Sequence, residues 1–153
     1  NCFIVHEERK TYHKGTGKTK TLIEMINSAL ESSKGSVVCI EKGNNLRLTL
    51  NYNCRLIDSD EYMINDAQAL YGFIAGLMAS NHDITDLFVD SALKICNNDA
   101  AAFDGFVELV AKLSEKLGVN IVMTSSIPAE EASDIVILDD NFLSISSIKT
   151  IPR

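Results

Sequence analysis

A run of glycine, lysine and hydroxyl residues near the N-terminus has the spacing of a loop that holds phosphate. Gly17, Lys18 and Thr19 match the end of the pattern G-x-x-x-x-G-K-[ST], and Gly15 is the additional glycine that often precedes it. Glycines let backbone N–H groups point at phosphate oxygens, and the positive end of the following helix faces the same anion. Lys18 would reach the β- and γ-phosphates, and the Thr19 hydroxyl would ligate Mg²⁺. The residues predicted to bind ATP are His13, Lys14, Gly15, Thr16, Gly17, Lys18, Thr19 and Lys20.

One position departs from this pattern, because Tyr12 stands where its first glycine belongs. A tyrosine adopts the positive φ values of glycine poorly, so the turn out of the preceding strand must differ. The alternative interpretation is a lysine-rich surface loop before an ordinary helix, in which His13 is simply solvated. An apolar run before the loop and helical periodicity after it, over 19–34, favour the phosphate-binding interpretation.

An acidic residue later in the chain suits the same phosphate and Mg²⁺ chemistry. Asp90 ends the apolar run Leu87-Phe88-Val89, and a carboxylate at the end of a buried strand can hold Mg²⁺ through water or beside Thr19. Thr19 and Asp90 are therefore the predicted metal residues. The alternative is an ordinary buried strand whose terminal aspartate caps a helix or lies in a loop.

Taken together, the loop and the acid-ended strand resemble the P-loop nucleoside triphosphatases, in particular their RecA-like branch, and the small stand-alone P-loop ATP-binding proteins of bacteria. Glu41 ends the expected strand that follows the helix over 19–34. The resemblance implies that Glu41 activates the attacking water, with Lys18 as the second catalytic residue. It also implies a polar residue at the end of the strand between the two motif strands, where Thr124 or Ser125 stands. The alternative for Glu41 is a solvated acid beside Lys42. The alternative for Thr124 or Ser125 is a strand-end hydroxyl without a role.

The pattern of elements predicts one P-loop nucleotide-binding domain over residues 1–153, an α/β three-layer sandwich with a mainly parallel central sheet and a closing antiparallel hairpin. Gly35 and Gly118 stand where left-handed C-terminal caps belong, and Asn98 or Asp99 can cap the last long helix. The expected helices are 19–34, 66–80 and 100–117. The expected strands are 2–5, 36–41, 46–50, 54–57, 84–90 and 119–124, with the hairpin formed by 135–138 and 143–148.

Composition narrows the classes of partner. A formal net charge of −7 argues against a general attraction to nucleic acid, which needs basic surface. No apolar run is long enough for a membrane span and no signal-peptide pattern opens the chain, so a cytoplasmic location is expected. The four cysteines form no C-x-x-C pair, which argues against a zinc or redox motif, and Cys39 is expected in the core.

The sequence leaves three functions open. The leading one is a slow Mg-dependent ATPase that acts as a switch or a partner-dependent motor, with a protein partner or as a homo-oligomer. A non-hydrolysing nucleotide-binding module is the second, and Tyr12 favours it. A nucleoside kinase-like phosphotransferase is the third, but the helix over 100–117 contains no arginine for a lid, and the cysteine spacing forms no zinc lasso.

Overall fold

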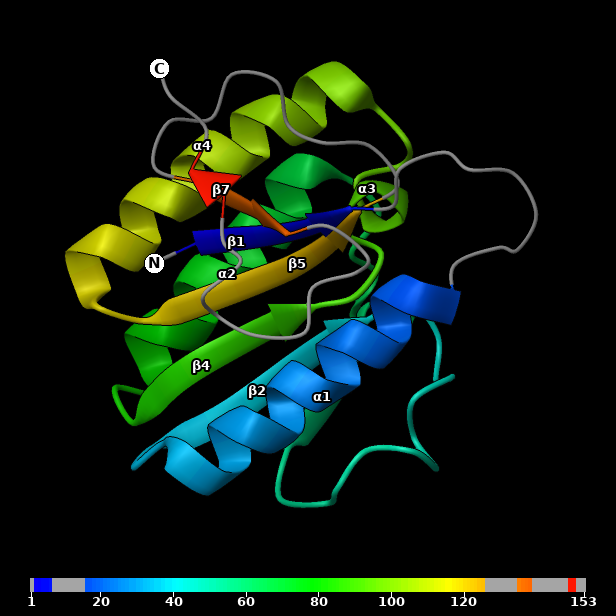
Figure 1. Cartoon of the computed structure of the whole chain (residues 1–153). Coiled ribbons are helices and arrows are strands. Elements are labelled where there is room, and N and C mark those ends of the chain that lie inside the picture. The colour runs from blue at the N-terminus through cyan, green and yellow to red at the C-terminus, as the bar shows by residue number, and fades with distance from the viewer. Residues whose placement is uncertain (1, 7–15, 126–134, 139–148, 151–153) are drawn as a thin grey trace.

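A computed structural model of the chain describes residues 2–6, 16–125, 135–138 and 149–150, with side chains for Cys2, Ile4 and residues 19–125 (Figure 1). The helices are α1 (Thr16–Ser32), α2 (Ala67–Ser80), α3 (Ala92–Ile95) and α4 (Ala100–Leu117), with a 3₁₀ turn, η1 (Ser59–Tyr62). The strands are β1 (Cys2–His6), β2 (Ser36–Glu41), β3 (Arg55–Asp58), β4 (Ile84–Val89), β5 (Asn120–Ser125), β6 (Ile135–Leu138) and β7 (Lys149–Thr150).

The centre of the molecule is an all-parallel sheet of four strands in the order β3-β2-β4-β5. β1 pairs in parallel with the outer side of β5, and β6 pairs in parallel with β1. Two residue pairs join β6 to β7 in the antiparallel sense. The predicted α/β class with a mainly parallel sheet is therefore confirmed.

Both faces of this sheet are covered, which gives three layers (Figure 1). α1 packs on one face, and α2 and α4 pack against each other on the opposite face. Successive side chains of a strand point to opposite faces, so the middle residues of β2 and β5 and the last three of β4 are apolar on both faces. In β2, for example, Val37 and Cys39 belong to the core beside α1, whereas Val38 and Ile40 belong to the larger core beneath α2 and α4.

The long helices begin and end at residues suited to those positions. The side chains of Asp66 and Asp99 accept backbone hydrogen bonds from the first turns of α2 and α4, at 2.7 and 3.1 Å. Each bond satisfies a helix N–H that has no partner within the helix. Gly118 ends α4 in the left-handed conformation, with φ of 67°. The predicted caps Asp99 and Gly118 are confirmed.

The predicted strand over 46–50 is wrong, because this segment forms turns. Its alternating leucines do not line one face of a sheet. Leu46 is buried, Leu48 is 100% exposed, and the backbone N–H groups of Thr49 and Leu50 both donate to the carbonyl of Leu46. Alternation therefore arose here from one anchoring leucine and the turns that follow it.

The predicted role of Gly35 is also wrong. Its φ is not positive, so it is not a left-handed cap. A Cβ atom at this position would overlap the carbonyl oxygen of Asp83 and the side-chain methyl of Thr85. Glycine is required because the chain leaving α1 passes directly against the start of β4.

The predicted closing hairpin is not seen among the described residues. Its first segment, 135–138, is β6 and pairs in parallel with β1, while its second segment, 143–148, lies outside the described part of the chain. Residues 7–15, which connect β1 to α1 and include Tyr12, also lie outside the described part of the chain.

Candidate functional site

Four polar residues form a row across the carboxyl ends of neighbouring parallel strands. The register pairs Glu41 of β2 with Asp58 of β3. Continued by one residue beyond the last recorded pairs, it places Asp90 beside Glu41 and Thr124 beside Asp90. The backbone N–H of Asp90 still donates to β2, at 2.8 Å, so the pairing persists at that level. We call these four residues the strand-end row.

The strand-end row faces the same side of the sheet as α1. Cys39, Phe88 and Val122 precede Glu41, Asp90 and Thr124 by two residues each. All three pack in the core that contains the α1 side chains Leu22 and Ile26. Because alternate residues of a strand point to the same face, the row lies on that face as well.

A hydrogen-bonded pair lies at the β4–β5 end of the strand-end row. The hydroxyl of Thr124 donates to Oδ1 of Asp90 at 2.7 Å, and accepts a bond of the same length from the backbone N–H of Ser91. Thr124 is buried, and Ser91 has a positive φ of 56°. The hydroxyl thereby fixes the orientation of the Asp90 carboxylate, whose other oxygen has no hydrogen bond to a described residue. The sequence offered Thr124 and Ser125 as alternatives, and Thr124 is the one that contacts Asp90.

Glu41 is buried and hydrogen-bonded to the backbone, which the sequence did not indicate. Its side chain is 1% exposed, and its two carboxylate oxygens accept the backbone N–H groups of Asn45 and Leu46 at 3.0 and 2.9 Å. Burial raises the pKa of Glu41 above its ordinary value, the two backbone bonds oppose this, and the nearby carboxylates of Asp90 and Asp58 raise it further. Glu41 is thus neither solvated nor paired with its neighbour Lys42.

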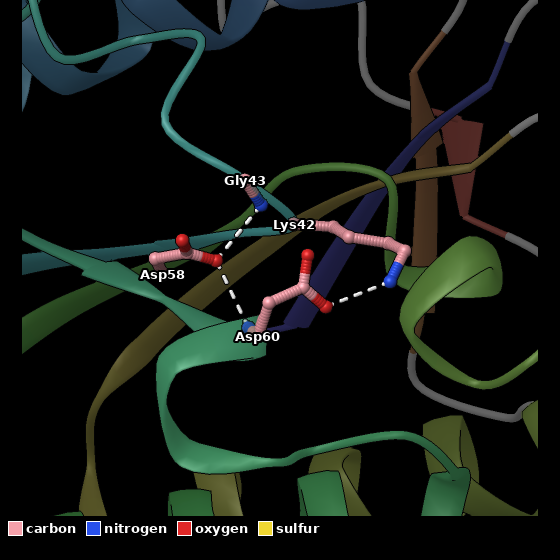
Figure 2. Close-up of polar contacts among 4 residues, drawn as sticks. All are labelled: Lys42, Gly43, Asp58 and Asp60. Carbon is pink, nitrogen blue, oxygen red and sulfur yellow. Dashed lines mark hydrogen bonds and ion pairs between the residues drawn. The ribbon is translucent and has the colours of Figure 1, made fainter.

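Lys42 instead contacts Asp60, in the segment that follows β3 (Figure 2). Its Nζ lies 2.8 Å from Oδ1 of Asp60. The Asp58 carboxylate accepts the backbone N–H groups of Gly43 and Asp60, at 2.8 and 2.9 Å. Two of these contacts, Lys42 to Asp60 and Gly43 to Asp58, join the segment after β2 to the end of β3 and the turn that follows it. No local sequence signal predicts them, because the partners are 15 and 18 residues apart.

The described part of the phosphate-loop motif lies at the start of α1. Thr16 is the first residue of that helix, Thr19 is half-buried and Lys20 is exposed. The helix therefore begins three residues earlier than predicted. The side chain of Lys18 and all of 13–15, as well as Tyr12, lie outside the described part of the chain. No hydrogen bond between described atoms joins Thr19 to Asp90.

Other chemistry is limited in the described part of the chain. No three histidine, cysteine or acidic side chains there are grouped as a metal site. All four cysteines are free and buried, as predicted for Cys39. Burial raises the pKa of Cys54 to about 11 and those of Cys2 and Cys96 to about 12, which disfavours thiolate chemistry. None of the described helices has the length and apolarity needed to cross a membrane.

Comparison with known proteins does not assign the chain to a family. No protein-family model matches the sequence, and no curated protein does. What the structure shows is a small α/β domain whose parallel four-stranded sheet is flanked by helices.

Proposed function

We propose that this chain is an ATP-binding protein of the RecA-like P-loop type that hydrolyses ATP slowly with Mg²⁺, as a switch or a partner-dependent motor. The backbone of 13–20 and Lys18 would hold the triphosphate. Thr19 and Asp90 would hold Mg²⁺, and Glu41 would orient the attacking water. The polar groups of the strand-end row would then act on the nucleotide from one side of the sheet.

The observation that carries this proposal is the hydrogen bond between Asp90 and Thr124 on the α1 face. Ligands of open α/β sheets bind outside the carboxyl ends of the strands, where this pair lies. β5 also stands between β1 and β4, the place that the resemblance gives to a strand ending in a polar residue. The Asp90 carboxylate is held by Thr124, and its other oxygen has no hydrogen bond to a described residue, which suits a magnesium ligand.

The proposal is tested by thermal unfolding of the wild type and Lys18→Ala with Mg-ATP and Mg-ADP. A ligand that binds only the folded state stabilises it by roughly 2.7 kcal/mol at a hundredfold excess over Kd. We expect a rise in Tm for the wild type and none for Lys18→Ala. Lys34→Ala is the matched control, because Lys34 is exposed just beyond the other end of α1 and should leave the shift intact. Equal shifts in the wild type and Lys18→Ala would refute the proposal.

A non-hydrolysing nucleotide-binding module is the second candidate, and the environment of Glu41 favours it. Both oxygens of this carboxylate already accept backbone N–H groups, at 3.0 and 2.9 Å. Each oxygen keeps a second lone pair, so a water could still be bound. Phosphate release from Mg-ATP, measured on the preparation used for the Tm shift, separates the two functions. A shift without turnover assigns the module.

A further inference from the structure

Two consecutive segments around β3 carry opposite charges. Residues 42–57 contain Lys42, Arg47 and Arg55 and no acidic residue, although the chain has 21 acids in all. Residues 58–66 contain four acids and no lysine or arginine. We call residues 42–55 the basic loop and residues 58–66 the acidic turn. Neither arginine of the basic loop forms an ion pair with a described residue.

Both segments also expose large apolar side chains. Leu48 and Tyr52 of the basic loop are 100% and 92% exposed, and Met63 and Tyr62 of the acidic turn are 79% and 54% exposed. Six large apolar side chains are exposed among the described residues, and these are four of them. Isolated exposed leucines are normal, but a group of this kind around one strand marks an interaction surface.

The two segments are joined to each other at their bases. Gly43 and Lys42 at the base of the basic loop contact Asp58 and Asp60 at the base of the acidic turn (Figure 2). β3 connects the segments and is an edge strand, because in the described sheet it pairs with β2 alone. Its outer backbone groups are thus available to another strand.

We infer that this surface, formed by the basic loop, β3 and the acidic turn, binds the same surface of a second copy of the chain about a two-fold axis. In such an arrangement the basic loop of each copy meets the acidic turn of the other, so the same contact forms twice. An antiparallel approach of the two β3 edges produces this match, since the segment before one strand then lies beside the segment after the other.

The charge distribution favours a second copy over a different partner. A uniformly acidic partner would be repelled by Asp60 and Glu61, and a uniformly basic one by Arg47 and Arg55. Two copies with a net charge of −7 each repel one another in general, so contact requires a surface whose charges are locally complementary. The exposed apolar side chains of both segments would be removed from water by the same contact.

Sedimentation equilibrium of the wild-type chain without nucleotide tests the inference independently of the proposed function. We expect a reversible monomer–dimer equilibrium that salt weakens. Leu48→Ser with Tyr52→Ser should weaken association by about tenfold or more, because exposed aromatic and apolar anchors carry much of an interface's energy. Leu109→Ser is the matched control, since Leu109 is a half-exposed leucine on α4 and should leave association unchanged. A strictly monomeric wild type, or association insensitive to the loop variant, overturns the inference.

A charge-reversal pair provides the sharper test. Arg55→Glu and Glu61→Lys each reverse one charge, the first in the basic loop and the second in the acidic turn. In a homodimer of either variant, position 55 of one copy and position 61 of the other carry like charges, so each variant alone should associate more weakly than the wild type. Mixing the two variants should strengthen association, since positions 55 and 61 then carry opposite charges at both loop–turn contacts. Failure of the mixture to associate more strongly than either variant alone contradicts the two-fold arrangement.

Discussion

Polar side chains at the two ends of the parallel sheet have different hydrogen-bond partners and different neighbouring charges. At the amino end, the buried Asp86 of β4 accepts hydrogen bonds from Thr85 and Asn120, at 2.8 and 3.2 Å, and the hydroxyl groups of Thr85 and Ser33 are hydrogen-bonded to each other. Gly35 completes this end by allowing the chain to pass against β4. Each polar group there has a partner of suitable chemistry, and the result is a closed structural contact between α1, β4 and β5.

At the carboxyl end, three carboxylates follow one another along the strand-end row. Asp58, Glu41 and Asp90 are close enough that the first and last raise the pKa of the buried Glu41. Lys42, the described cationic residue next to Glu41 in the sequence, contacts Asp60 and not the strand-end row. Like charges placed together cost stability, and protein folds retain such costs chiefly at sites with a function. The comparison therefore separates a structural end of the sheet from the end at which we propose that nucleotide binds.

The largest expected effect is at the structural end. Gly35→Ala should lower the free energy of unfolding by about 3 kcal/mol, because its Cβ would overlap the backbone of Asp83 and force the chain away from β4. Urea denaturation measures this loss. Gly105→Ala is the matched control: no atom lies within 4 Å of its added Cβ, and a glycine replaced inside a helix should raise stability by about 0.5–1 kcal/mol. Similar values for both variants would remove the evidence that close approach explains Gly35.

A smaller effect is expected from matched Asp→Asn substitutions at the two ends of β4. Asp86→Asn should cost about 1–2 kcal/mol, because an amide nitrogen replaces an oxygen that accepts a hydrogen bond. Asp90→Asn should change stability by less than about 0.5 kcal/mol, since its amide oxygen can still accept from Thr124 while a like charge is removed from the row. If nucleotide binds as proposed, Asp90→Asn should instead weaken its dependence on Mg²⁺. Equal losses of stability would abolish the distinction between the two ends.

The sequence predicted secondary structure best where the conformation depends on residues within a single helix or strand. Continuous apolar runs identified β2, β4 and β5, and Asp99 and Gly118 marked the ends of α4, because these features depend on local conformation and burial. The segment 46–50 was misassigned because alternation in so short a segment also occurs in a turn with one buried residue.

The candidate site was predictable only in part, for a related reason. Glu41, Asp90 and Thr124 could each be placed at a strand end, but their order across the sheet depends on pairings between residues distant in sequence. The hydrogen bonds that bury Glu41 come from a turn whose path no local signal determines. The interaction surface around β3 was missed because charge and exposure had to be combined with the position of an edge strand.

The smallest expected effect is a pH dependence at the carboxyl end of the sheet. The pKa of Glu41 is raised from its ordinary value of 4.5, chiefly by burial, so the folded state favours its protonated form. This contribution to stability is fully present below the unfolded-state pKa and is lost as pH rises through the folded-state pKa. Glu41→Gln cannot titrate, so the Tm of the variant minus that of the wild type should increase between about pH 4 and about pH 7. Glu24→Gln, an exposed substitution on α1, should show no comparable trend. A difference for Glu41→Gln that stays constant or decreases with pH would mean that like charges and burial do not act on Glu41 as the strand-end row requires.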